Sequence, residues 1–157
     1  MMANIQAASP VIQTVICISV DTAAVIAWSQ SHPGQLLNTG IYMVDNQLAN
    51  GSQNEGGLEL STRCNPGDRV GFHVVPIDPT QGDTVGFSGF DIDNGSIFGS
   101  SGFPTAQGTT TPGAPFSNFW VGRAVAGGTT IYHPQLVITS DGINHVVTWD
   151  PFLTVPT

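Results

Sequence analysis

The chain has 157 residues, and its composition excludes several classes of protein before any motif is considered. This length corresponds to about one domain. Hydrophobic residues make up 40%, which is enough for a packed core and too much for general disorder. Eleven carboxylates against three arginines and no lysine give a net charge of −8. That balance argues against nucleic-acid binding and against a polybasic membrane anchor, since both need clustered cations.

The N-terminal part of the sequence predicts a cytoplasmic protein. A secretory signal starts with positive charge, and no Lys or Arg precedes Arg63. The most apolar stretch, residues 11–28, is interrupted by polar side chains, so no membrane insertion is expected. Cys17 and Cys64 are then expected to be free thiols, because reducing compartments keep them so.

Short runs rich in Val, Ile, Thr and aromatic residues, separated by turn residues, predict strands in the first half of the chain. The first run, Val11–Val20, is mostly apolar and predicts a central strand covered on both faces. Asp21 and Thr22 predict the cap of a short helical turn that reaches Trp28. Further strands are expected at Gly40–Asp45, Leu58–Thr62, Arg69–Val75 and, more weakly, Thr84–Phe90.

The second half of the sequence combines a long irregular segment with further strands. Residues 95–118 are dominated by Gly, Ser, Thr and Pro, which predicts a long loop with a functional role or high mobility. The expected anchors of this loop are Phe98, Phe103 and Phe116. The expected strands are Phe119–Val125, Thr130–Thr139 and Ile143–Trp149. Asp141-Gly142 predicts a hairpin turn, and Pro134 predicts an edge position or a break in its strand.

Together these elements predict one all-β domain over residues 1–157, with residues 1–10 as a loose N-terminal segment. Many short strands with almost no helix are typical of an antiparallel β-sandwich or a barrel. The uneven strand lengths favour the sandwich, and we expect a jelly-roll-like connectivity.

The sequence DIDNGS at residues 91–96 is the sharpest candidate for a metal site. Oxygen donors at Asp91, Asp93 and Asn94 beside a glycine are what a hard cation such as Ca²⁺ needs. However, the helical Ca²⁺ loop requires a carboxylate at its twelfth position, where this chain has Gly102. The favoured interpretation is therefore a polar turn whose side chains bind local backbone amides, with a Ca²⁺ site as the alternative.

Motifs for catalysis are missing from the sequence, so we expect no enzyme and assign no catalytic or cofactor-binding residue. The nucleophile elbow, the H-E-x-x-H motif, the Walker loop and the dinucleotide fingerprint are all absent. A Ser-His-Asp triad assembled in space is the alternative. Trp120 is a candidate for a ligand groove bordered by residues 95–118, in which its ring would stack on a sugar; aromatic residues in such a fold are more often core.

Four segments, spaced in this order, span the chain nearly end to end: VICISVDTAAVI at 15–26, IYMV at 41–44, LELSTRCNPGDRV at 58–70 and WDPFLTV at 149–155. They resemble the opening strand with its V-D-T signature, the Y-M-V strand, the leucine-alternating strand with N-P-G-D and the closing W-D-P motif of the PixA/AidA family of bacterial inclusion-body proteins. Two departures stand out. Ser29–Gln35 alone suggests that family's Asn/Pro/Ser-rich loop, and residues 95–118 have no counterpart.

The resemblance implies a small cytoplasmic β-sandwich protein that collects in inclusion bodies, in some members linked to host interaction. It implies no catalytic residue. We therefore expect a non-catalytic protein that associates with itself as a dimer or higher homo-oligomer, and more strongly as the pH falls towards the pI near 4.4. The alternative is a lectin-like module that binds glycans, in a Ca²⁺-dependent manner if residues 91–96 hold the ion.

Overall fold

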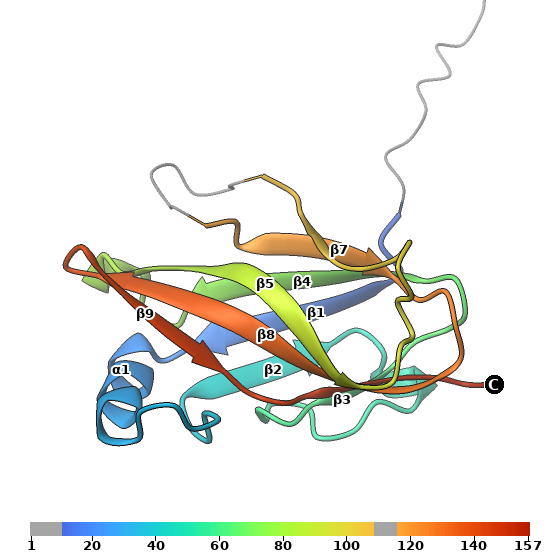
Figure 1. Ribbon diagram of the computed structural model, residues 1–157, viewed down its shortest axis with the longest axis horizontal. Helices are drawn as coiled ribbons and strands as arrows, with labels where there is room; N and C mark the ends of the chain where they lie inside the picture. Colours follow the sequence, from blue (N-terminus) through green and yellow to red (C-terminus); the bar gives the residue numbers. More distant parts are fainter. Residues whose placement is uncertain (1–10, 109–115) are drawn as a thin grey trace, which may run out of the picture.

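Alternating apolar residues build two β-sheets that share one core (Figure 1). The computed structural model describes residues 11–108 and 116–157. The first sheet has the strand order β2 (Ile41–Asp45), β1 (Thr14–Val20), β4 (Arg69–Pro76), β7 (Phe119–Arg123), β6 (Thr105–Ala106). The second sheet has the order β3 (Ser61–Arg63), β10 (Phe152–Val155), β8 (Gly128–Ser140), β5 (Thr84–Asn94), with β9 (Ile143–Thr148) also paired to β8.

The strand pairings confirm an all-β fold and correct its expected geometry. The two sheets are mixed rather than purely antiparallel, because β1 pairs with β4 and β3 pairs with β10 in parallel. After β1 the chain forms a helix and β2 before it returns as β4, and such a crossover brings the returning strand in parallel to the first. The described strands do not close into a barrel. The jelly-roll connectivity and the single-domain organisation stay predictions.

The one α-helix of the described residues begins where the sequence predicts it. Helix α1 spans Thr22–Ser31, and the Asp21 carboxylate at its N-cap accepts a hydrogen bond of 3.1 Å from the Ala24 amide. Two short 3₁₀ turns, η1 (Leu48–Asn50) and η2 (Pro79–Gln81), join strands further along the chain. Figure 1 shows α1 at one end of the two sheets, below β9.

The core lies between the two sheets and is rich in aromatic rings. Phe72 of β4 stands at its centre, with ring centroids 4.7 Å from Phe90 and 5.5 Å from Tyr132. Trp149 is fully buried, and its indole Nε1 donates to the Met43 Sδ at 3.2 Å, which joins the second sheet to β2 of the first. Most of the stabilisation therefore comes from apolar burial between the sheets.

Strand β1 differs from its prediction on one face. It lies between β2 and β4, but its residues alternate between buried and accessible, so one face alone is covered. Ile16 and Ile18 are fully buried, whereas Cys17 is exposed. An apolar run therefore does not require burial on both faces, and the uncovered face becomes important below.

Pro134 corrects another expectation, because β8 is an interior strand that continues through it. The neighbour of β8 on one side changes at this point: β10 pairs as far as Ile131, and β9 pairs from Gln135 onwards. Between them the backbone of residues 149–151 breaks the ladder, and the Tyr132 amide donates to the Pro151 carbonyl at 3.1 Å. Proline is tolerated here because no ladder hydrogen bond from residue 134 is needed. Strand β10 itself was not predicted.

The segment 95–118 is partly anchored as expected. Ile97 and Phe98 are buried in the core. The Phe103 ring packs edge to face with the Phe98 ring, with ring centroids 6.4 Å apart, although Phe103 is 39% exposed. The segment also contributes the short edge strand β6 to the first sheet. The expected loose segment 1–10 and residues 109–115 lie outside the described residues. No described helix is both long and apolar enough to cross a membrane.

Candidate interaction surface

The outward-pointing residues of β2, β1, β4 and β7 form a broad surface, which we call the outer face of the first sheet. Strand pairing sets these residues in rows across the sheet, because side chains of paired residues point to the same side. One row is Val44, Cys17, His73 and Phe119. The remaining positions are Val15, Ser19, Tyr42, Arg69, Gly71, Val75, Val121 and Arg123.

Neutral side chains dominate this face, and several apolar ones are accessible. Tyr42 is 48% exposed, Val44 46% and Val75 37%. The Cys17 thiol lies between them in the row arrangement and is also exposed. Ile12 and Phe119 both lie over Gly71: a Cβ atom at residue 71 would come within 3.1 Å of the Ile12 Cγ2 and 3.2 Å of the Phe119 ring. Glycine at that position therefore lets these two side chains pack close to the sheet.

Charge distinguishes the outer face of the first sheet from the rest of the molecule. The chain has eleven carboxylates and a net charge of −8, yet none of the outward positions of these four strands is acidic. Its two charged residues, Arg69 and Arg123, pair with each other at one end of the face. Apolar and carboxylate-free surface of this kind is typical of a contact between proteins.

The residues predicted to hold Ca²⁺ lie on a strand rather than in a turn. Strand β5 continues through Asn94, and the chain turns at Gly95, which has a positive φ of 82°. Asp91 accepts a hydrogen bond of 2.5 Å from the Gln135 amide, and Asp93 lies 3.9 Å from the His133 Nε2. Both carboxylates are thus on the outside of the second sheet, and the described residues contain no cluster of three metal-ligating side chains. A Ca²⁺ site at Asp91, Asp93 and Asn94 stays a prediction.

Trp120 lies at the edge of the core. Its ring centroid is 5.5 Å from that of Phe90, and its indole Nε1 donates to the Ser117 carbonyl at 3.1 Å. Its ring is half-buried, and none of the hollows described below includes it. This position agrees with the more frequent role of aromatic residues in such a fold, which is to pack in the core. A ligand groove at Trp120 stays a prediction.

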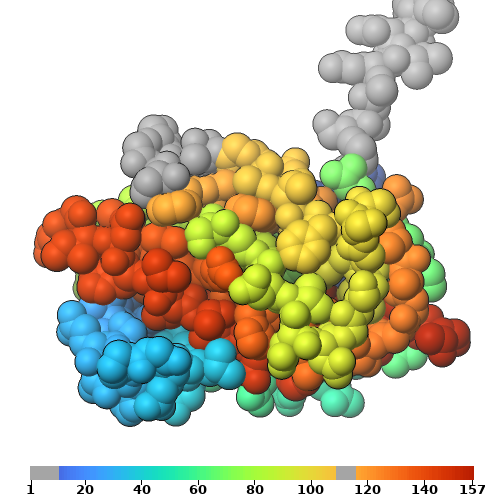
Figure 2. All heavy atoms as spheres, viewed as in Figure 1, coloured from blue at the N-terminus to red at the C-terminus, as the bar shows by residue number. Residues whose placement is uncertain are grey.

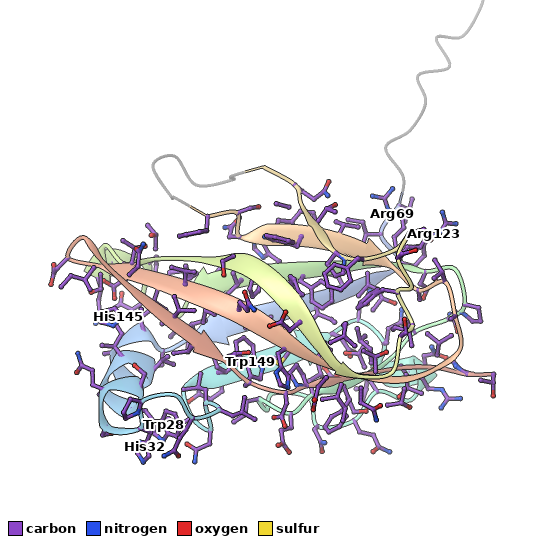
Figure 3. All side chains as sticks on the ribbon, viewed as in Figure 1. Trp28, His32, Arg69, Arg123, His145 and Trp149 are labelled. Carbon is purple, nitrogen blue, oxygen red and sulfur yellow. The ribbon has the colours of Figure 1, made fainter. Side chains whose placement is uncertain are left out.

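The tryptophans do not gather into a platform for sugars. Trp149 is fully buried, and Trp28 on α1 stacks on His32 with centroids 4.2 Å apart, a pair labelled in Figure 3. The three indoles therefore have three different environments. The structure supplies no support for the lectin alternative.

A hollow of about 610 Å³ lies between the end of α1 and β9, and its lining mixes polar and apolar residues. In Figure 2 the segment that contains α1, in blue, lies below β9, in red. His32 and His145 line it together with five amide or hydroxyl side chains: Ser29, Gln30, Gln35, Gln135 and Thr148. These groups can form hydrogen bonds, but the lining contains no Asp, Glu, Lys or Arg that would select a charged ligand.

His32 is not arranged as a catalytic base for the neighbouring Ser31. The Ser31 hydroxyl lies 3.0 Å from the His32 Nδ1, but the same nitrogen lies 3.0 Å from the Trp28 carbonyl oxygen. A carbonyl only accepts hydrogen bonds, so the Nδ1 must carry the proton and cannot take one from serine. This geometry differs from that of an activated nucleophile.

A second group of titratable side chains is directed into the interior beneath β2. The Asp45 amide donates to the Glu55 Oε1 at 2.9 Å, and each of the two carboxyl groups has one buried oxygen that lacks a partner among the described residues. Burial, followed by the nearby Asp45 carboxyl, raises the pKa of Glu55 against the opposing effect of the amide hydrogen bond. Burial also raises the pKa of Tyr132 well above its ordinary value.

Burial also suppresses the reactivity of the Cys64 thiol. Burial, and then the charge of Asp68, raise the pKa of Cys64 to about 12, so it stays a thiol at neutral pH. Cys17 and Cys64 are both free, as the sequence predicts. Cys17 is therefore the accessible thiol of the pair.

The outer face of the first sheet is the feature that the sequence analysis missed. The signal was present in the alternation of the segment IYMV, where Tyr42 and Val44 occupy the outward positions opposite the buried Ile41 and Met43. Their importance depends on the neighbouring strands, and the strand order could not be read from the sequence.

The fold and surface described above have a solved counterpart. The crystal structure of the inclusion body protein PixA from Burkholderia cenocepacia J2315 superposes with a TM-score of 0.67 over 96% of this chain and 99% of that chain, at 18% sequence identity. The two proteins therefore share a fold, in agreement with the resemblance found in the sequence. The search of curated proteins gave no match.

A family model matches most of the chain. The model described as Domain of unknown function (DUF8788) matches residues 12–146, and the chain belongs to this family. The expected resemblance to PixA/AidA proteins thus holds at the level of the fold, and the family is defined without a function.

The Asp45–Glu55 pair generates a pH-dependent prediction. A carboxyl whose pKa is raised by folding stabilises the protein at low pH, and this contribution is lost as the pH rises through the raised value. We therefore expect Glu55→Gln to raise the thermal midpoint at pH 8 and to have no effect near pH 4. Thermal unfolding followed by circular dichroism at both pH values measures the difference.

Glu59 is the matched control, because it is the only other glutamate and is exposed. Glu59→Gln should leave the midpoint nearly unchanged at both pH values. Equal effects of the two variants, or a Glu55→Gln variant that is less stable at pH 8, would contradict a raised pKa of Glu55 in the folded protein.

Proposed function

We propose that this protein is a non-catalytic, self-associating cytoplasmic protein of the inclusion-body type, and that its copies associate through the outer face of the first sheet. The observation that carries the proposal is the absence of carboxylates from this one accessible sheet face in a chain of net charge −8. The shared fold with a protein whose solved structure is described as an inclusion body protein supports it.

Bringing two acidic copies together costs electrostatic free energy. Surfaces that carry carboxylates repel their own copies, and juxtaposed like charges cost several kcal/mol at an interface. The second sheet carries Asp91 and Asp93 on its exterior. The outer face of the first sheet avoids this cost, and burial of Tyr42, Val44 and Val75 against a second copy would contribute roughly 25 cal/mol for each Å² of apolar surface removed from water.

The distribution of charge along this face favours an arrangement in which two copies run in opposite directions. Arg69 and Arg123 lie at one end of β4 and β7. Asp78 and Asp83 follow the other end of β4, where Asp83 accepts a 2.7 Å hydrogen bond from the Thr22 hydroxyl. A two-fold contact between opposed copies would place the arginines of each over the carboxylates of the other. Such isologous contacts are the commonest kind in homodimers.

A charge placed on the proposed interface should disrupt it. We expect Val44→Glu to weaken self-association at least about tenfold, because it adds like charge and removes apolar contact on the face. Sedimentation equilibrium over a range of protein concentrations measures the dissociation constant. Val44 is accessible on an edge strand, so the substitution should be tolerated by the fold.

Val146→Glu is the control for this experiment. Val146 is 66% exposed on β9 of the second sheet, outside the proposed interface. It should leave the dissociation constant within about twofold of the unmodified protein. If both variants weaken association equally, net charge rather than the proposed face governs it; if neither does, the face is not the interface.

Acidification should strengthen association, because it removes net charge. The formal net charge of −8 at pH 7 falls in magnitude as the pH approaches the pI near 4.4, so the repulsion between copies weakens. We expect the average mass from light scattering to rise from pH 8 to pH 5 at fixed protein concentration and ionic strength. A chain that stays monomeric across this range at high concentration would count against self-association.

His73 needs its own control in that titration, because it lies on the interface itself. His73→Gln removes the imidazole from this face, and the mass of this variant should still rise as the net charge falls.

A further inference from the structure

We infer that the hollow around Arg69 and Arg123 is a binding site for a small phosphate-type oxyanion, either inorganic phosphate or the phosphoryl group of a small molecule. The observation is the placement of two of the three cations in the chain directly opposite each other in one ladder, at the edge of a hollow of about 200 Å³. Figure 3 shows the two residues labelled at the same end of the molecule.

The backbone pairing brings the two arginines close together. The Arg69 amide donates to the Gln13 Oε1, and the Arg123 amide donates to the Gly102 carbonyl, so the two residues do not exchange backbone hydrogen bonds. They therefore form a non-hydrogen-bonded antiparallel pair, in which Cα atoms are typically about 4.5 Å apart and side chains are closest. Like charges directly opposite each other destabilise a sheet. An anion between them would remove this penalty.

No carboxylate of the described residues forms an ion pair with either guanidinium. Asp68 is the neighbour of Arg69 in sequence, but its Oδ2 accepts hydrogen bonds from the Thr14 hydroxyl and the Asn65 amide on the buried side. The Arg123 Nε donates to the Gly67 carbonyl at 3.3 Å, which fixes this side chain, and no residue of 11–108 or 116–157 forms a hydrogen bond with its two terminal nitrogens. The planar guanidinium fork matches the oxygens of a phosphate.

The rest of the lining suits an oxyanion as well. Ser101 and Thr105 supply hydroxyl donors, and the lining contains no acidic residue. The Gln107 Nε2 donates to the Thr105 carbonyl at 3.1 Å and to its Oγ1 at 3.3 Å, so the Thr105 hydroxyl proton can be donated elsewhere. The wall formed by residues 101–102 is fixed tightly against β7, because a Cβ atom at Gly102 would come within 2.2 Å of the Arg123 carbonyl oxygen. The hollow is smaller than the usual 300–1,000 Å³ of a drug-sized pocket, which favours a small ligand.

In the proposed two-fold contact the same arginines face carboxylates of the second copy, so phosphate would compete with association, and the experiment keeps the two effects apart. The chain has three arginines and no lysine, so three Nε–Hε signals represent its strong cations in an NMR spectrum of the ¹⁵N-labelled protein. Titration with inorganic phosphate at constant ionic strength and pH should shift the signals of Arg69 and Arg123 in a saturable way. The signal of Arg63, on β3 of the second sheet, should stay in place. The same titration on the Val44→Glu background excludes an effect of association.

Variants of the three arginines supply the second readout. Phosphate should raise the thermal midpoint of the unmodified protein, because it binds the folded state. Arg69→Gln and Arg123→Gln should lose this increase, while the matched variant Arg63→Gln should keep it. Without phosphate, Arg69→Gln should be at least as stable as the unmodified protein, since the like-charge contact is gone and the Arg123 hydrogen bond to Gly67 is kept. This outcome also shows that loss of binding is not loss of folding.

Titration with glycerol phosphate identifies the source of the phosphoryl group, and acetate is the control for a general anion effect. Glycerol phosphate binding more tightly than inorganic phosphate would identify a phosphomonoester as the ligand, and the reverse order would identify the free ion. Equal shifts of all three arginine signals, no saturation, or acetate acting as well as phosphate would each overturn the assignment.

Discussion

The parallel pairing of β1 with β4 is the constraint on which the rest of the structure depends. It aligns Ile16 with Phe72 on the inner side and Cys17 with His73 on the outer side, and so determines which residues form the core and which form the surface. A shift of one residue would exchange the two sets, because successive side chains of a strand point to opposite faces. The burial of the Phe72 ring among Phe90 and Tyr132 prevents this shift.

Local patterns predicted the individual elements well. Asp21 predicted the start of α1, and Asp141-Gly142 predicted a hairpin turn that the structure forms with positive φ at both residues. Long-range pairing could not be predicted in this way. Pro134 was taken as a sign of an edge or a break, yet it is tolerated inside the sheet because residues 149–151, far along the chain, interrupt the neighbouring ladder.

The candidate site was harder to predict than the fold. The polar side chains of residues 91–94 predicted a cation site because their alternating oxygen donors resemble a cation-binding loop. Alternating polar residues are equally typical of a strand, and β5 extends through these residues. Tyr42, Val44 and Cys17 are unremarkable in sequence and become a surface only when the register places them in adjacent rows. Candidate ligands could be recognised from single residues in the sequence. A surface formed by residues of several strands could not, because it depends on the strand order and register.

Association through the outer face of the first sheet is tested most directly at Cys17. This thiol is exposed on that face, while Cys64 is buried with a pKa of about 12, so a charged maleimide reports on Cys17 alone. Its rate of modification should fall several-fold as the protein concentration rises through the dissociation constant. The Val44→Glu variant, held at the same concentrations, should keep the fast rate throughout. Association measured by mass without any slowing of Cys17 modification would show that the copies meet elsewhere.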